Sequence, residues 1–383
     1  MKVEFTPEQE ALRTKLRAYF SNLMTPELQA ENIRDMGEGG GPLWREALRQ
    51  MGRDDWIGLG WPQELGGKGM SPIEQFIFVE ECMRAGYSFP FLTTESVGPQ
   101  LAEHGNEWQK TEIVPKILAG DCLIAIGYSE PGAGTDLAAL KTTAVKDGDE
   151  WVINGQKMWT SLAHFCDYVW LAVRTDPDAP KKHKGISIFL VPTSDPGWSA
   201  TRVTTLGGVK TNATFYDNIR VSEKHLVGEL NGGWKLITGQ LNRERLSLVN
   251  YGPTAELFNN VVKWAQQTDL PAGGKVIDQP WVQINLAKVR AGVEVLKLVA
   301  YKQAWAMTEG TLEMADASAA KVYGSEFFIE AYRLLGEILG QGSLVSADSE
   351  TGQLLQGRLE RLYRTASIIT FGGGTNEIQR DII

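Results

Sequence analysis

The sequence has little cysteine and histidine, no long apolar run and no excess of basic charge. Its three cysteines (Cys82, Cys122, Cys166) are widely spaced and its four histidines are scattered, so neither a disulfide framework nor a metal site is indicated. A net charge of −9 argues against broad binding to nucleic acid or acidic membranes. The longest apolar runs, such as Ile186–Val191, are too short for a membrane span, and the N-terminus lacks the apolar core of a signal peptide. We expect a reducing, cytoplasmic location.

The chain does contain an ordinary globular composition, with 43% hydrophobic and 22% charged residues over a length of 383. That length is enough for two or three domains with their own cores. Helical periodicity fills the first part, and the segment Thr6-Pro7-Glu8-Gln9 predicts a capped helix start. Short runs rich in Val, Ile, Thr and aromatic residues then predict strands, before long helices return. The predicted fold class is α+β, with domains at residues 1–122, 123–229 and 230–383.

The stretch from Trp234 to Tyr251 predicts a helix with a carboxylate, Glu244, in the middle of its apolar face. Burying an ionised carboxylate without a partner is costly. Glu244 therefore either pairs with Arg243, Arg245 or a distant cation, or is a general base whose proton affinity is raised in a dry pocket. The residues that share its face are Ile237, Leu241, Leu248 and Tyr251. The residues alone leave both interpretations open. Gly252-Pro253 should kink or break this helix.

Three further stretches contain candidate ligand-binding residues. In IGYSEPGAGTDLAAL (126–140), Gly132 and Gly134 would let backbone N–H groups approach a phosphate or a heteroaromatic edge, although an ordinary turn fits equally well. In INGQKMWTSLAHFCDY (153–168), Asn154-Gly155 predicts a hairpin turn. Trp159 there is followed by two residues with hydroxyl groups. A Trp in a strand is usually a core residue, but one beside paired hydroxyls could also stack on a flavin ring. TFGGGTNEIQR (370–380) is either a hinge or a backbone that passes close to a ligand.

In this order and spacing, the three stretches resemble the acyl-CoA dehydrogenase family. WPQELGGKG (61–69), the segment from Glu107 to Gly120 and DNIRVSEKHLVGELNGGW (217–234) are similar to that family as well, so the resemblance covers essentially the whole chain. It implies an all-α N-terminal domain, a middle β-barrel domain and a C-terminal four-helix bundle. It also implies FAD as cofactor, an acyl-CoA thioester as substrate and electron-transfer flavoprotein as the electron acceptor.

The resemblance implies cofactor roles for residues of the first stretch. Ile126, Tyr128 and Ser129 would line the flavin ring, and Ser129 would hydrogen-bond its pyrimidine end. Gly134 and Thr135 would meet the FAD pyrophosphate and the CoA side. Thr135 is therefore expected to contact both cofactor and substrate.

The other implied positions lie in the second and third stretches. Trp159 would stack near the ring, Ser161 would reach toward its N5/O4 edge, and Thr375 would also contact the cofactor. Most family members have their catalytic base, a Glu, in the tail just before a Gly-Thr pair, and here that position is Gly373. A minority place the base on the opposite helix, where the matching residue is Glu244.

The implied reaction is α,β-dehydrogenation, in which Glu244 takes the α-proton while the β-hydrogen leaves as hydride to flavin N5. Two hydrogen bonds to the thioester carbonyl, from the flavin ribityl and a backbone N–H, would stabilise the enolate-like charge. Arg245 is expected to order the helix and the acyl pocket. The resemblance thus favours the general-base interpretation of Glu244, because the usual base is missing from the tail.

The chain departs from the family where a neighbouring subunit usually completes the FAD site. Members use an Arg before a Phe-Gly turn and a Gln followed by Gly-Gly-x-Gly. Residues 267–279 contain no such Arg, and residues 337–343 begin with Glu337, which would face phosphate unfavourably. We therefore predict an α2β2 heterotetramer with a second acyl-CoA dehydrogenase-like chain. It would resemble the base-bearing subunit of actinobacterial enzymes that degrade steroid side chains, acting on a short, C3-type side chain.

Three alternatives remain at this stage. The first is a homotetramer that oxidises ordinary medium or branched acyl-CoA. The second is a flavin oxidase or monooxygenase on the same fold. The third is a non-catalytic partner subunit.

Overall fold

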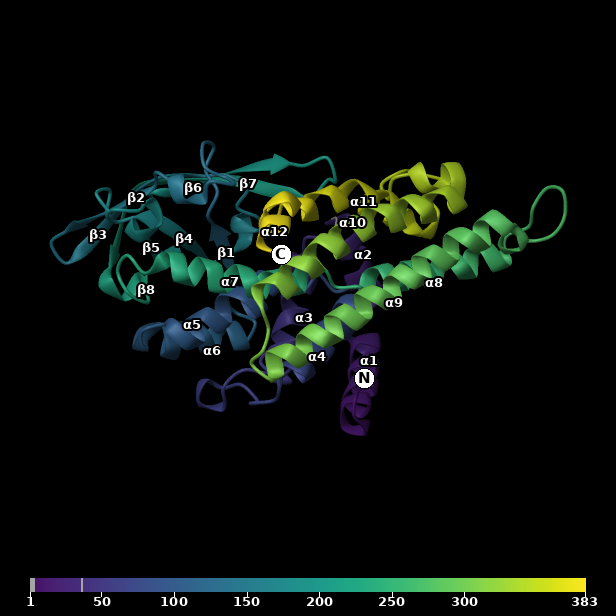
Figure 1. The fold of residues 1–383 in the computed structure, drawn as a ribbon, viewed down its shortest axis with the longest axis horizontal. Coiled ribbons are helices and arrows are strands. Elements are labelled where there is room, and N and C mark those ends of the chain that lie inside the picture. Colours follow the sequence, from purple (N-terminus) through teal and green to yellow (C-terminus); the bar gives the residue numbers. More distant parts are fainter. Residues whose placement is uncertain (1–3, 36) are drawn as a thin grey trace.

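The structure is a computed structural model that describes residues 4–35 and 37–383, and for residues 242–248 it describes the helical backbone without the side chains. Helices of the N-terminal part, a β-sheet and helices of the C-terminal part follow one another along the chain (Figure 1). The sheet lies at one end of the molecule, and the long C-terminal helices extend away from it (Figure 1). The predicted helical–β–helical order is confirmed.

Among the described residues of the N-terminal part, all the regular elements are helices, as predicted. Thr6 caps the first helix, because its Oγ1 accepts a hydrogen bond from Gln9 N at 3.3 Å and Gln9 Oε1 accepts one from Thr6 N at 3.0 Å. The helices are α1 (Pro7–Leu23), α2 (Pro26–Arg34), α3 (Pro42–Arg53), α4 (Pro72–Arg84), α5 (Gly98–His104) and α6 (Val114–Leu118), with π-helical turns η2 (Leu92–Val97) and η3 (Gln109–Ile113) before the last two.

The middle part forms one eight-stranded sheet with the order β6-β7-β3-β2-β4-β5-β8, and β1 pairs in parallel with β4. The strand β4 is almost wholly buried, which suits its run of Val, Trp, Leu and Ala. The strands are β1 (Ile124–Gly127), β2 (Thr143–Asp147), β3 (Glu150–Lys157), β4 (Tyr168–Arg174), β5 (Ile186–Pro192), β6 (Trp198–Thr204), β7 (Lys210–Ser222) and β8 (Leu226–Val227).

The C-terminal part contains four long helices. They are α7 (Gly233–Leu248), α8 (Gly252–Gln267), α9 (Pro280–Thr308) and α10 (Met314–Leu339), followed by α11 (Arg358–Thr365), the turn η11 (Ala366–Thr370) and α12 (Asn376–Ile382). Of the four, α8, α9 and α10 share one apolar core. The predicted break at Gly252-Pro253 is confirmed, because α7 has ended by Leu248 and α8 begins at Gly252. The apolar pattern predicts that Tyr251 lies on α7. In the structure Tyr251 instead lies between the two helices.

Helix α7 sits where the three parts of the chain meet. Its buried Leu236 and Ile237 belong to one apolar cluster with Val97 of η2, Trp170 of β4 and Ile188 of β5. Burial of large apolar side chains is the main stabilising term of a fold. This cluster therefore fixes α7 against both the sheet and the N-terminal helices.

None of the described helices combines the length and the apolar character that a bilayer span requires. The three cysteines are free and buried. Burial raises the pKa of the Cys122 thiol to about 12, so this thiol is protonated at neutral pH and is a poor nucleophile.

Candidate active site

The loop after β1 is tied into the protein interior by Tyr128. The Tyr128 hydroxyl accepts a hydrogen bond from Trp170 Nε1 and donates one to Gln240 Oε1, each at 2.9 Å. Its neighbours Ile126 and Ser129 are only half-buried. The loop therefore has one anchored side chain, with its two neighbours still accessible to a ligand.

The following turn is open. Gly134 and Thr135 are exposed, and a Cβ added at Gly132 or Gly134 would meet no atom within 4 Å. Glu130 and Ala133 close the turn through two backbone hydrogen bonds of 2.9 and 3.1 Å. Its backbone is thus fixed while its outer surface is free for a ligand, as the glycine pattern predicts.

A buried ion pair joins the first and second predicted stretches. Lys157 of β3 is fully buried, and its Nζ donates to Glu130 Oε1 at 2.9 Å and to the Tyr128 backbone oxygen at 3.0 Å. Met158 N donates to the Ser129 backbone oxygen at 2.8 Å. Burial lowers the pKa of Lys157 to about 8, and the Glu130 carboxylate opposes that shift. The structure thereby brings together two loops that the sequence treats separately.

Trp159 emerges from this junction with a large exposed surface. Its φ is +64°, a left-handed conformation that is uncommon for a bulky residue, and its side chain is 58% exposed. The next residue, Thr160, is buried. Its backbone oxygen accepts a hydrogen bond from Asn212 Nδ2 at 2.8 Å, and its backbone N donates to the Asn212 backbone oxygen at 3.0 Å. Ser161 is half-buried beside them. Trp159 is therefore not a core residue: it is held outward, which fits the stacking interpretation.

The predicted hairpin turn at Asn154-Gly155 is wrong. Both residues lie inside β3, which has a bulge there and pairs with β2 on one side and β7 on the other. The turn is instead at Gly148, which has a φ of +61° between β2 and β3. A side chain at Gly155 would approach Thr142 Oγ1 to 2.5 Å, so this glycine is required by close packing.

The third stretch is fixed by a buried lysine on α10. Lys321 is fully buried, and its Nζ donates to the backbone oxygens of Thr370 (3.1 Å) and Gly374 (2.8 Å) and to Asn376 Oδ1 (2.7 Å). Gly373 has a φ of +70°, which favours glycine. Thr375 caps α12 by accepting from Ile378 N at 3.3 Å. The glycine run is thus a held segment and not a free hinge.

Glu244 and Arg245 lie outside the residues whose side chains the structure describes. Their backbone positions are on α7. On the predicted face of this helix, Ile237 is buried and Leu241 is half-buried. The role of Glu244 as a base, and that of Arg245, therefore stay predictions.

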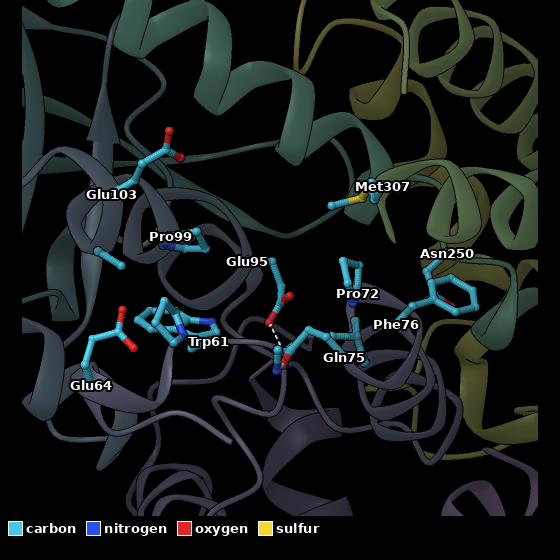
Figure 2. A pocket seen from close by; sticks show the side chains of 14 residues that line it. Trp61, Glu64, Pro72, Gln75, Phe76, Glu95, Pro99, Glu103, Asn250 and Met307 are labelled. Atoms are coloured by element: carbon cyan, nitrogen blue, oxygen red, sulfur yellow. Dashed lines mark hydrogen bonds between the residues drawn. The ribbon is translucent and has the colours of Figure 1, made fainter. Parts of the chain in front are cut away.

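A pocket of about 570 Å³ lies between α4, the η2–α5 segment and the loop at residues 60–64 (Figure 2). Asn250, which follows α7, and Met307 of α9 complete its wall. At its centre Gln75 Nε2 donates to Glu95 Oε1 at 2.8 Å, and Gln75 Oε1 accepts from Gly60 N at 2.8 Å. Its apolar wall includes Trp61, Pro72, Phe76, Val79, Pro99 and Ala102.

The sequence reasoning missed this pocket. One signal was present, namely the polar residue Gln75 directly before the apolar run Phe76–Val79, and Gln75 is indeed buried. Periodicity alone cannot tell a pocket wall from a core, because both are apolar on the inner face.

Glu337 is engaged within its own chain. On α10 it forms an ion pair with Arg333, and its Oε2 accepts from Asn285 Nδ2 of α9 at 2.8 Å. The loop from Asp269 to Lys275 is closed by a backbone bridge and by an ion pair of 2.6 Å. An acidic side chain therefore occupies the position where the family resemblance expects a Gln.

Comparison with known proteins matches three family models in order along the chain. They are the N-terminal domain (residues 6–121), the middle domain (125–219) and the C-terminal domain (231–383) of acyl-CoA dehydrogenase. The chain is 52% identical to the acyl-CoA dehydrogenase FadE26 of Mycobacterium tuberculosis, over 100% of this chain and 97% of FadE26.

Two solved structures are similar over the whole chain. A chain of the ChsE4-ChsE5 complex from Mycobacterium tuberculosis matches with a TM-score of 0.93 and 51% identity, over 100% of this chain and 97% of that one. A chain of the Tcur3481-Tcur3483 steroid ACAD matches with a TM-score of 0.92 and 46% identity, at the same coverage.

Proposed function

Because this chain belongs to the acyl-CoA dehydrogenase family of oxidoreductases, we propose that it catalyses FAD-dependent α,β-dehydrogenation of a steroid side-chain acyl-CoA as the base-bearing subunit of an α2β2 enzyme. The observation that carries this proposal is the combination of Gly373 in the tail with a carboxylate at position 244 of α7. The base is thereby moved from the tail to the helix opposite.

The described residues fit FAD. The open turn at Gly132 and Gly134 offers backbone donors without obstruction, and the outward-held Trp159 offers a large planar surface. Ile126, Tyr128, Ser129, Thr135, Ser161, Gly134 and Thr375 are the further positions proposed to hold the cofactor. When bound, FAD supplies the acceptor for the hydride that leaves the β-carbon.

The protein's own part in the reaction is small and specific. The Glu244 carboxylate is proposed to take the α-proton, so that a double bond forms as the β-hydrogen leaves with its electron pair. A thioester α-proton is too weakly acidic for water to remove, and a carboxylate in a water-excluding site is a stronger base than one in solvent. Arg245, Thr135 and Gly373 are proposed to shape the substrate side of the site.

The pocket of about 570 Å³ is proposed to receive the acyl group. Its volume falls within the range of about 300 to 1,000 Å³ that is usual for small-molecule sites. Its wall contains Asn250, which lies shortly after α7. The bulky apolar residues of the wall suit a rigid ring system. The similarity to a structure named as a steroid ACAD supports a steroid substrate.

A second acyl-CoA dehydrogenase-like chain is the proposed partner. Helix α9 exposes an apolar stripe at helical spacing, formed by Trp281, Ile284, Val295, Leu298 and Trp305, and such stripes usually pack against another chain. Glu337, already paired with Arg333, offers phosphate no donor, so a second copy of this chain would be poor at completing the FAD site and a different chain would have to supply the missing groups. Two heteromeric complexes among the similar structures support this assembly. Electron-transfer flavoprotein is the proposed electron acceptor.

The decisive experiment compares Glu244→Gln with Glu229→Gln, an exposed glutamate just before α7. Each variant is co-expressed with a neighbouring-gene partner and mixed anaerobically with candidate acyl-CoA thioesters. We expect E244Q to bind FAD and substrate normally but to lose flavin bleaching by at least a thousandfold, while E229Q behaves as wild type. Bleaching by E244Q at the wild-type rate would refute the base.

Assembly and reaction class are tested separately. The chain purified alone should hold less than one FAD per subunit and gain full occupancy only with its partner. Stoichiometric FAD and full activity in the isolated chain would instead support a homotetramer. Slow reoxidation of the reduced flavin in air supports a dehydrogenase, and rapid reoxidation would indicate an oxidase or monooxygenase.

A further inference from the structure

A buried chain of hydrogen bonds links the three elements that surround the proposed site. Trp170 Nε1 donates to the Tyr128 hydroxyl at 2.9 Å, and this hydroxyl donates to Gln240 Oε1 at 2.9 Å. Gln240 Nε2 donates in turn to Ser96 Oγ. Trp170, Gln240 and Ser96 are fully buried, and Tyr128 is nearly so. The Gln240 amide thus accepts from Tyr128 through its oxygen and donates to Ser96 through its nitrogen.

Each partner of Gln240 belongs to a different functional part. Tyr128 is in the loop proposed to hold the flavin ring. Ser96 is in the π-helical turn η2, directly after Glu95 in the pocket wall (Figure 2). Gln240 itself is on α7, and position 244 follows it by four residues, about one helical turn further along. The amide therefore links the flavin loop, the pocket wall and the helix of the proposed base.

Such a link constrains the orientation of α7. Rotation or sliding of the helix would break one or both of these hydrogen bonds, and losing a hydrogen bond between buried polar groups is costly. The apolar contacts of Leu236 and Ile237 in the same cluster are less directional, so they tolerate small rotations that the amide does not. A shift of about 1 Å at a reacting group can lower a rate by about a hundredfold.

We propose that Gln240 is a positioning residue for the reaction: held between Tyr128 and Ser96, it sets the rotation and depth of α7 and so places the carboxylate at position 244 relative to the flavin loop and the acyl pocket. This inference rests on the proposed function, because it assigns Gln240 a role toward that base. A merely structural role would stabilise the fold without any selective effect on proton removal.

The test uses the co-expressed holoenzyme and the thioester that bleaches the wild-type flavin. Gln240→Met removes both bonds at similar volume, and Gln240→Glu keeps the shape while losing the N–H donor. Tyr128→Phe removes only the hydroxyl. The matched control is Tyr332→Phe, because the Tyr332 hydroxyl is also buried and bonds only Thr254, at 2.9 Å, among the described residues of the C-terminal core.

We expect Q240M, Q240E and Y332F to keep the FAD content and visible spectrum of the wild type. In Q240M and Y128F, the anaerobic flavin-reduction rate at saturating thioester should fall by about tenfold to a hundredfold, with substrate affinity changed by less than about threefold. The kinetic isotope effect of an α-deuterated thioester should rise, while that of a β-deuterated one should not. Amide hydrogen exchange in residues 241–250 should accelerate in both variants and stay unchanged in Y332F.

Several outcomes would overturn the inference. An equal loss of rate in Y332F, or a loss that follows only the melting temperature, would reduce Gln240 to a structural residue. An unchanged α-deuterium effect or unchanged exchange in residues 241–250 would do the same. Should Q240M fail to fold, Q240E and Ser96→Ala give the same readouts with smaller changes. If E244Q is inactive while Q240M reacts normally, this inference fails and the proposed function stands; if E244Q reacts normally, both fail.

Discussion

Lys157 and Glu130 form an ion pair in which the lysine is fully buried, the Glu130 side chain is 7% exposed and Nζ lies 2.9 Å from Oε1. The lysine also donates to the Tyr128 backbone oxygen at 3.0 Å. The pair joins β3 to the loop proposed to bind the flavin ring. Glu130 is further fixed by donors from Thr142, at 2.7 and 2.8 Å. The geometry of this loop therefore depends on a charge pair that does not itself need to touch a ligand.

Lys157→Met should destabilise the fold and weaken FAD binding. Removing one partner leaves a buried carboxylate uncompensated, which lowers the free energy of unfolding by roughly 3 to 5 kcal/mol. We expect at least a tenfold weaker retention of FAD, measured by flavin release on dilution together with urea unfolding. Lys146→Met is the control in the same sheet, because its pair with Glu223 is exposed and contributes about 0 to 1 kcal/mol. Equal behaviour of the two variants would contradict this prediction.

Lys321→Met should release the C-terminal tail. Without the ammonium, the backbone oxygens of Thr370 and Gly374 and the buried Asn376 Oδ1 each lose a donor, at about 1 to 3 kcal/mol for each one left buried and unsatisfied. Limited proteolysis should then cleave after residue 370, and hydrogen exchange there should rise. Lys302→Met, which breaks only the exposed pair with Asp316, should leave the tail protected. A protected tail in K321M would show that α12 packing alone holds it.

Glu38 should make stability depend on pH between about 4.5 and 7. Burial raises the pKa of Glu38 to about 7, against the attraction of Lys210 and Arg202. The folded protein thus binds this proton more tightly than the unfolded chain, and the resulting stabilisation is complete below pH 4.5 and is lost as the pH rises through about 7.

The Glu38→Gln variant fixes the neutral form and removes this dependence. Relative to E38Q, wild type should therefore lose stability as the pH is raised, as measured by urea unfolding across that range. Parallel stability curves for the two proteins would disprove the raised pKa.

Leu298→Glu should block association with the proposed partner. Leu298 is 49% exposed in the apolar stripe of α9, and a charge buried there without a counter-charge opposes docking. We expect gel filtration of the co-expressed pair to show separate chains, with unchanged helical content by circular dichroism. Leu43→Glu is the matched control, because Leu43 is similarly exposed, at 44%, but lies on α3. Normal assembly of L298E would place the interface elsewhere.

Much of the fold was predictable because it rests on local signals. The cap at Thr6 and the break at Gly252-Pro253 depend on residues that are neighbours in sequence, and both are confirmed. The turn at Asn154-Gly155 failed for the opposite reason. A local turn preference there is overruled by pairing with two strands and by the close approach of Thr142.

The sequence by itself determined the order of the elements, the family and the position of the proposed base, because Gly373 and Glu244 can be read directly along the chain. Only the tertiary structure decided what surrounds that position. The contacts of Gln240 with Tyr128 and Ser96 join residues more than a hundred positions apart. Such contacts arise when apolar cores pack and force polar groups to find partners across domains, and no local pattern specifies which partners meet.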